Sequence, residues 1–138
     1  PQGLPELRPG ALRPEERPLI GIDVVAIGRI EGLSGHARKR IFHPDELILA
    51  EKNSRPAEFL AGRFAVKEAF FKAVGEGMKT LSTQDVWTTR GEHGEPVINL
   101  SSKARALTGG RTVTLSISHD DPVAVAVVLI SGGNDGAF

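Results

Sequence analysis

The 138-residue chain has no cysteine, which excludes disulfide bonds and thiolate zinc sites and fits a reducing compartment. Its 17 basic and 17 acidic residues cancel to a net charge of zero, which disfavours general nucleic-acid binding. It also lacks any apolar run near the ~20 residues of a membrane span, and it shows no recognisable signal peptide. We therefore expect a cytoplasmic, globular protein that binds neither nucleic acid nor membrane.

What is present is an ordinary globular composition, with 40% hydrophobic and 25% charged residues, in a length that suits one domain. Residues 1–18 are rich in proline and contain few large apolar groups, so a flexible leader is expected there. Residues 19–131 form the expected domain, and the end at 132–138 is expected to be a disordered tail.

Hydrophobic periodicity and turn residues predict the order strand, helices, two strands, short helix, two strands. This order is typical of an α+β fold, here an antiparallel sheet packed on one long central helix. The continuously apolar last strand indicates a strand covered on both faces. The expected strands are 19–27, 84–89, 96–100, 112–118 and 123–130, with a tight turn at 119–122, and the expected helices are a short helix or turn from 28, then 44–52, 56–74 and 103–107.

The long helix at 56–74 is predicted from a run of helix formers and aromatics that begins with proline and ends at glycine. Most of its sides are apolar, which is typical of a buried helix. Glu68 and Lys72 nevertheless lie one turn apart on it, and on a helical wheel Ala61 and Ala65 flank Glu68. One interpretation is an i,i+4 ion pair on a solvated face, worth about 0.2–0.5 kcal/mol. The other is that the small alanines leave room for a bound group.

Three polar residues stand where a purely structural domain would not place them: Asp23 inside the first strand, Glu68 on the buried helix, and His119 just past a strand. Two carboxylates from separate elements, without cysteine or a His-x-x-x-His spacing, favour a hard divalent cation such as magnesium. Lys72 and Arg63 are suited to phosphate charge. The pattern predicts metal-assisted chemistry on a phosphorylated substrate. The alternatives are a structural ion pair and, for Asp23, a strand-end residue that caps the next turn.

Residues 36–42 gather a histidine and three cations, Arg38, Lys39 and Arg40, ahead of two apolar residues. Such a cluster is either an ordinary solvated face or a docking site for an acidic partner. In a docking site, exposed charges raise the association rate and set the orientation of the partner.

Three blocks of this sequence resemble the signature blocks of the holo-[acyl-carrier-protein] synthases, the small phosphopantetheinyl transferases. The blocks are GIDVVAIGRI at 21–30, RFAVKEAFFKAVG at 63–75 and SISHD at 116–120. They stand in the family's order and at about its spacing, and the regions 36–47 and 94–96 look similar too. The resemblance spans roughly 19–130, all but the leader and the tail.

The resemblance implies a phosphopantetheinyl transferase-like fold and a magnesium-dependent reaction of lipid metabolism. In that reaction 4'-phosphopantetheine moves from coenzyme A to a serine of apo acyl carrier protein, and adenosine 3',5'-bisphosphate is released. A homotrimer with the site between subunits is implied as well. Asp23 and Glu68 are then the metal ligands and, with Lys72 near the reacting phosphate, the catalytic residues. The implied coenzyme A contacts are Arg63, Lys72, Gly75, Gly94, Pro96 and His119, and the implied carrier-protein contacts are Arg29, Arg38 and Arg40.

The chain departs from the family pattern at Glu95, where the family often has lysine, and this puts nucleotide contact from the turn at 94–96 in doubt. The loop at 75–79 is more acidic than the family's, and the leader is either a linker from a larger fused synthase or an extended start. Two other functions remain open: another magnesium-dependent phosphoryl or nucleotidyl transferase, and a non-catalytic relative that binds carrier proteins. Against the second, the implied metal ligands, lysine and histidine are all present.

Overall fold

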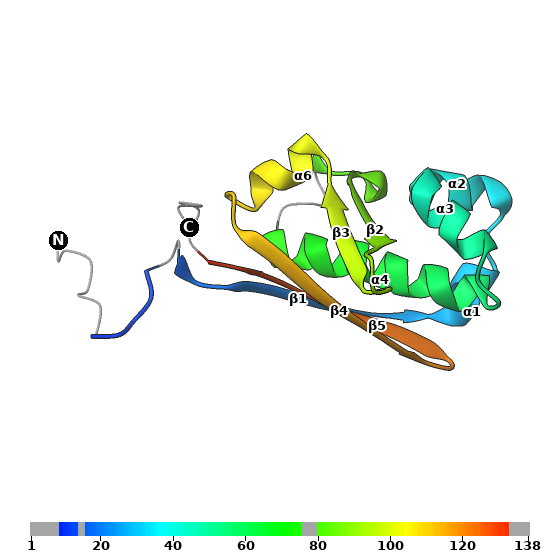
Figure 1. The fold of residues 1–138 in the computed structure, drawn as a ribbon, viewed down its shortest axis with the longest axis horizontal. Coiled ribbons are helices and arrows are strands. Elements are labelled where there is room, and N and C mark those ends of the chain that lie inside the picture. The colour runs from blue at the N-terminus through cyan, green and yellow to red at the C-terminus, as the bar shows by residue number, and fades with distance from the viewer. Residues whose placement is uncertain (1–8, 14–15, 76–79, 133–138) are drawn as a thin grey trace.

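The structure of the protein, a computed structural model, describes residues 9–13, 16–75 and 80–132. Helix α4 (Pro56–Val74) runs through the middle of the molecule, between a three-stranded sheet on one side and a two-stranded hairpin on the other (Figure 1). The other elements in chain order are β1 (Leu19–Ala26), α1 (Ile27–Glu31), α2 (Gly35–Ile41), α3 (Pro44–Glu51), η2 (Thr83–Asp85), β2 (Val86–Arg90), β3 (Pro96–Leu100), α6 (Ser102–Leu107), β4 (Thr112–Asp120) and β5 (Val123–Ser131).

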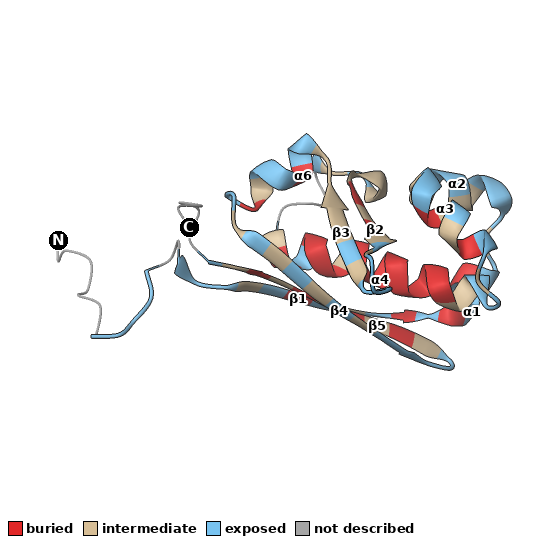
Figure 2. Cartoon of the chain, viewed as in Figure 1, coloured by how far each residue is buried: buried red, intermediate tan, exposed pale blue. Residues whose placement is uncertain are grey.

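Helix α4 begins and ends where the sequence predicts. Pro56 is its first residue, and Gly75 closes it in the left-handed conformation, with φ 78° and its N–H bonded to the Phe71 carbonyl. Thirteen of its 19 residues are buried, so the helix is covered on nearly every side (Figure 2). Ala61 and Ala65 are fully buried. The space beside them is therefore filled by the protein itself and is not left for a bound group.

The three-stranded antiparallel sheet has the order β1-β5-β4 and lays one face on α4. β1 alternates as predicted, and Gly21 is buried on the helix side. A Cβ at Gly21 would collide with the Ala69 carbonyl oxygen, so only glycine allows this approach. The outer face carries Ile20, Ile22 and Val24, which are exposed at 66%, 55% and 58%.

The sequence predicts one sheet, but β2 and β3 pair as a separate antiparallel hairpin. The predicted strand at 84–89 is wrong at its start, because its first two residues belong to the single 3-10 turn η2. There the Ser82 hydroxyl accepts from the Gln84 N–H at 3.1 Å, and the Asp85 carboxylate accepts from the Ser82 N–H at 2.7 Å. This local capping box satisfies the backbone without a partner strand.

The β4–β5 hairpin extends further than predicted. His119 and Asp120, expected in the turn, continue β4 and pair with Ala124 and Val123. Only residues 121–122 connect the two strands. A two-residue connection lets the ladder run to the end of both strands, so His119 is held by strand pairing and not by a loop.

β5 is not covered on both faces, contrary to the prediction. Fully buried residues that face α4, such as Ala126 and Val128, alternate with half-buried residues on the outer face, such as Val125 and Val127. The register places Val127 opposite Ile22 of β1. The outer face of the sheet is therefore apolar across both β1 and β5.

The short elements follow the prediction. α1 is the expected short helix after β1, α3 starts at Pro44 behind a His43 cap, and α6 starts behind a Ser101 cap. α2 carries the basic cluster. The elements required for an α+β fold on a long helix are thus all in place.

The limits of the domain stay a prediction, although β1 begins at Leu19 and β5 ends at Ser131. The expected flexible leader and disordered tail fall largely on residues 1–8, 14–15 and 133–138, which lie outside the described residues. In the part of the chain that is described, no helix is long and apolar enough to cross a lipid bilayer.

Candidate active site

Asp23 and Lys72 meet where β1 packs on the last turn of α4. The Lys72 ammonium donates to Asp23 Oδ1 at 2.8 Å and to the Ile22 carbonyl at 3.1 Å. The Asp23 side chain is 17% exposed and the Lys72 side chain 59%. Because the ammonium remains accessible to water, it can exchange these partners at little cost.

Glu68 is the half-buried member of the same group. Its pKa is raised above the ordinary value, first by burial and then by the negative charge of Asp23, while Arg29 and Lys72 act in the opposite direction. The negative charge of Asp23 acts on Glu68 because the two residues lie on either side of the contact of β1 with α4. The structure thus brings together Asp23, Glu68 and Lys72, as the sequence predicts.

The donor set of this group suits a divalent cation. The charge of Asp23 disfavours ionisation of Glu68, and Asp23 is already paired with a positive charge, the Lys72 ammonium. Within the described ranges, no three His, Cys, Asp or Glu side chains gather to hold a metal alone. A cation at Asp23 and Glu68 would complete its shell with water and substrate oxygens, which is the way magnesium binds. The residues present therefore fit magnesium.

The position of Asp23 depends on Gly21, two residues earlier on the same face of β1. Gly21 lets the strand backbone approach the Ala69 carbonyl, one residue after Glu68. A side chain at Gly21 would push β1 off the helix and widen the gap between the two carboxylates.

A second polar group lines a cavity of about 240 Å³ beside the first half of α4. Arg63 reaches it from α4, Arg90 from the end of β2, and His119 from β4. Arg55 and Glu58 line it as well, and Glu58 Oε1 lies 3.3 Å from His119 Nδ1. Among the described residues, three arginines and one carboxylate residue, Glu58, therefore line this cavity.

Arg63 is 8% exposed, and its Nε finds no hydrogen-bond partner in the part of the chain that is described. Its Cζ lies over the Phe59 ring at 3.9 Å from the centroid, and the Arg90 Cζ lies over the same ring at 5.2 Å. Burial, and then repulsion by Arg90, lowers the pKa of Arg63 to about 10. Two neighbouring guanidinium groups with an unpaired buried donor suit an anionic ligand such as a phosphate.

The two groups do not meet within one chain. Arg63 and Glu68 are five residues apart, a rotation of about 140° on an α-helix, so their side chains leave α4 on different sides. None of Asp23, Glu68 and Lys72 lines the cavity shared by Arg63 and His119. Each half of the predicted site is assembled, but the halves lie apart.

The predicted glycine contacts lie on two turns. Gly75 ends α4 and Gly94 sits in the β2–β3 turn, with φ of 78° and 81°. Pro96 opens β3, and none of the three lines the arginine cavity. The Glu95 carboxylate accepts from the His93 N–H at 2.9 Å. The Glu95 carboxylate is therefore hydrogen-bonded within its own turn.

The three predicted docking arginines differ in their surroundings. Arg38 is half-buried, and its Nη2 donates to the Ile30 carbonyl at 3.1 Å, which joins α2 to α1. Arg29 lies over the Phe64 ring at 5.0 Å from the centroid, and both Arg29 and Arg40 are exposed. Arg29 and Arg40 therefore face solvent, whereas Arg38 also supports the fold.

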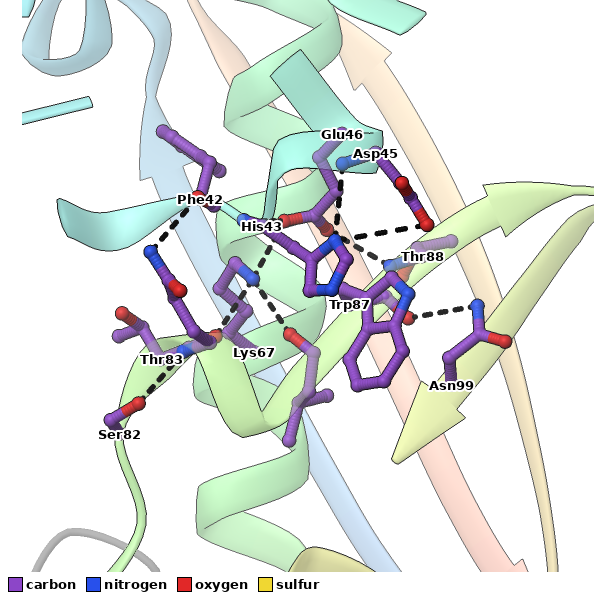
Figure 3. A network of polar contacts seen from close by, with 12 residues as sticks. Phe42, His43, Asp45, Glu46, Lys67, Ser82, Thr83, Trp87, Thr88 and Asn99 are labelled. Atoms are coloured by element: carbon purple, nitrogen blue, oxygen red, sulfur yellow. Dashed lines mark hydrogen bonds and ion pairs between the residues drawn. The ribbon is translucent and has the colours of Figure 1, made fainter. Parts of the chain in front are cut away.

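The sequence interpretation missed two buried charges, Glu46 and Lys67. The sequence suggests only that Glu46 favours the start of α3, and it assigns Lys67 no role. Both side chains are 0% exposed, and Lys67 Nζ lies 2.7 Å from Glu46 Oε1 (Figure 3). The available signal was a lysine within a helix that is apolar on most sides. Arg90 was also missed, because no motif marks the end of β2.

Comparison with known proteins gives a consistent result. Residues 19–128 match the family described as the 4'-phosphopantetheinyl transferase superfamily. The holo-[acyl-carrier-protein] synthase of Geobacillus kaustophilus is 46% identical over 117 residues, which cover 80% of this chain and 86% of that protein. The Bacillus anthracis synthase, solved in complex with CoA (3',5'-ADP), is 38% identical with a TM-score of 0.71, covering 83% of this chain and 96% of that one. The Helicobacter pylori synthase, solved with coenzyme A, is 36% identical with a TM-score of 0.72, covering 82% and 100%.

The matched region contains both polar groups, from Asp23 in β1 to His119 in β4. The solved relatives share the α+β arrangement in which an antiparallel sheet packs on a long helix. The chain therefore belongs to the 4'-phosphopantetheinyl transferase superfamily, among its holo-[acyl-carrier-protein] synthases.

Proposed function

We propose that this chain transfers the 4'-phosphopantetheine group of coenzyme A to a serine of apo acyl carrier protein and releases adenosine 3',5'-bisphosphate. The observation that carries the proposal is the group of Asp23, Glu68 and Lys72 at the β1–α4 contact, in a chain of this family. The coenzyme A bound to two solved relatives supports it, because the arginine-lined cavity suits a phosphorylated ligand. A cytoplasmic location and a role in fatty-acid biosynthesis stay predictions.

Magnesium is the proposed cofactor, with Asp23 and Glu68 as its protein ligands. An ion held there would neutralise charge on the coenzyme A pyrophosphate. The serine oxygen forms a bond to the β-phosphorus as the bond from that phosphorus to the bridging oxygen breaks, and the serine proton passes to a base or to water. Lys72 leaves Asp23 and offers its ammonium to the reacting phosphate.

A site shared between subunits would bring the two polar groups together. Arg63 and Glu68 leave α4 on different sides, so one chain supplies the carboxylates and a neighbouring chain supplies the arginine cavity. In this arrangement Arg63 and His119 of one subunit hold coenzyme A phosphates against Asp23 and Glu68 of the next. The unpaired Arg63 Nε supports this role.

The outer face of the sheet supports assembly into the proposed homotrimer. Ile20, Ile22 and Val24 are more than half exposed, beside the half-buried valines of β5. A contiguous apolar patch of this kind is typical of an interface between chains. Light scattering should give the mass of three chains, and Ile22→Asp should give inactive monomers. An active monomer would contradict the shared site.

The acyl carrier protein is the proposed partner of α1 and α2. Arg29 and Arg40 are exposed there and suit an acidic protein. The half-buried Arg38 would contribute charge beneath them while it bonds to Ile30.

Mass spectrometry of apo acyl carrier protein, incubated with coenzyme A and magnesium, tests the function. We expect a gain of one phosphopantetheine, about 340 Da, that EDTA abolishes. Folded enzyme that modifies neither a fatty-acid nor a polyketide carrier protein would contradict the proposal. Consumption of nucleotides without coenzyme A would indicate another phosphoryl transferase, and a stable complex without mass gain would indicate a non-catalytic binder.

A further inference from the structure

The pair of Glu46 and Lys67 is buried where α3, α4 and β2 meet (Figure 3). Neither side chain has any exposed surface. Removing two charges from water is costly, and well-packed apolar residues in the place of such a pair are often as stable or more stable. Stability alone therefore does not explain why the pair is present.

Lys67 uses every donor of its ammonium. Besides Glu46, Nζ donates to the Thr83 carbonyl at 2.8 Å and to the Val86 carbonyl at 2.6 Å. An ammonium has three N–H groups, so the side chain is held in one direction. Helix α4 is thereby tied to η2 and to the start of β2.

Both carboxylate oxygens of Glu46 also have hydrogen-bond partners. Its Oε1 accepts from the His43 N–H at 3.1 Å in addition to Lys67, and its Oε2 accepts from the Thr88 N–H at 2.9 Å. The carboxylate thus joins the start of α3 to the middle of β2. Together the two side chains connect four elements through charge-assisted hydrogen bonds, which are stronger than neutral ones.

The position of Lys67 on α4 connects this network to both halves of the active site. Lys67 directly precedes Glu68, so the two side chains differ in direction by about 100°. Lys67 also lies one turn after Arg63, on nearly the same side of the helix. Rotation of α4 about its axis would turn Glu68 away from Asp23 and Arg63 away from Arg90 at the same time.

We propose that Glu46 and Lys67 are positioning residues, which fix the rotation of α4 against β2 so that Glu68 faces Asp23 and Arg63 faces Arg90. This inference rests on the proposed function for the roles of those four residues. The pair touches no substrate and acts through the two polar groups on either side of it.

The test is the double variant Glu46→Gln/Lys67→Met, which removes both buried charges while keeping the side-chain sizes. Mn²⁺ binding by electron paramagnetic resonance, coenzyme A binding by calorimetry, and thermal unfolding are measured on the full chain. We expect cooperative unfolding, with Mn²⁺ affinity reduced about tenfold or more, as for residues that orient metal ligands. Coenzyme A affinity falls as well, because the Arg63–Arg90 geometry loosens.

The matched control is Glu51→Gln/Lys52→Met, which makes the same chemical changes at two exposed positions at the end of α3. It should bind Mn²⁺ and coenzyme A as the wild type does. If the folded Glu46→Gln/Lys67→Met variant also bound both ligands with unchanged affinity, the positioning role would be wrong.

Should the double variant fail to fold, Glu46→Asp decides, because it keeps a negative charge beside Lys67 but shortens the carboxylate side chain by one methylene and so loosens the network. Reduced Mn²⁺ and coenzyme A affinity in this folded variant supports the inference, and unchanged affinity overturns it. The wild type is assayed for transfer in parallel. If the wild type binds both ligands but transfers nothing, the proposed function is refuted. The measured affinities of the variants then still decide whether Glu46 and Lys67 are positioning residues.

Discussion

Helix α4 carries two lysine–carboxylate pairs, five residues apart, that differ in almost every respect except their chemistry. Lys67 and Glu46 are fully buried, and each charged group is saturated with hydrogen bonds. Lys72 is 59% exposed and shares its ammonium between Asp23 and a single carbonyl. The buried pair cannot exchange partners without leaving a charge unpaired, whereas the exposed pair can. The buried pair is thus held in place, whereas the exposed pair is free to exchange partners, as the role proposed for Lys72 requires.

The largest effect is expected when the exposed group loses its second carboxylate. Glu68→Ala should reduce transfer about a thousandfold or more, because the proposed magnesium ion would lose one of its two proposed protein ligands. The protein should stay folded, since Glu68 is half-buried and belongs to no saturated network. The mass assay measures transfer and circular dichroism the fold. Full activity at saturating magnesium would show that Glu68 is not a ligand.

Removing the lysine of each pair should lower the stability of the protein by different amounts. Lys67→Met leaves Glu46 buried without its counter-ion and should lower the free energy of unfolding by about 3–5 kcal/mol. Lys72→Met breaks a pair that is more than half exposed on one side and should cost about 1 kcal/mol or less. Urea unfolding monitored by Trp87 fluorescence compares the two variants. Equal losses would mean that burial does not distinguish these pairs.

A smaller effect should distinguish the exposed from the half-buried arginine at the predicted docking site. Arg40→Glu, at an exposed position, should raise the Michaelis constant for the carrier protein about tenfold, while that for coenzyme A stays unchanged. Arg38→Glu should raise it as well but also lower stability, because it breaks the bond to Ile30. Steady-state kinetics with each substrate varied in turn provides the measurement. An equal rise for both substrates would contradict docking at α2.

The smallest expected effect is on the pH dependence of the stability of the metal-free protein. The raised pKa of Glu68 means that the folded state binds its proton more tightly than the unfolded state does. Ionisation of Glu68 therefore lowers stability as pH rises from the ordinary glutamate pKa through the raised value. With EDTA at neutral pH, Glu68→Gln should melt slightly above the wild type, and the gain should shrink in acid. A variant that melts lower at neutral pH would contradict this sign.

The sequence was sufficient to locate α4, β1 and the group on which they converge. Pro56 and Gly75 mark the helix ends by backbone chemistry that needs no tertiary information. Asp23 within an apolar strand and Glu68 on an apolar helix stand out because each is unfavourable unless it is paired. Local signals of this kind can be read without knowledge of the fold.

The sequence was not sufficient where the outcome depended on which elements touch. A helical wheel gives the direction in which Lys67 leaves the helix. It does not identify the Thr83 and Val86 carbonyls that accept hydrogen bonds from its ammonium. The alanines beside Glu68 indicate space on the helix, but they do not show that the protein itself fills it. The place of His119 in β4 required the register of the hairpin, which depends on the length of its turn.

The different directions of Arg63 and Glu68 on α4 also have a genetic consequence. With a site shared between subunits, a chain that lacks Glu68 still offers an intact arginine cavity, and a chain that lacks Arg63 still offers intact carboxylates. If the proposed homotrimer forms, co-expression of the two inactive alleles should restore some activity, because each mixed trimer would contain one boundary at which both intact halves meet. Inactivating substitutions in this single gene would then fall into two complementation groups. One group would affect the carboxylates on the Glu68 side of α4, and the other the cavity on the Arg63 side.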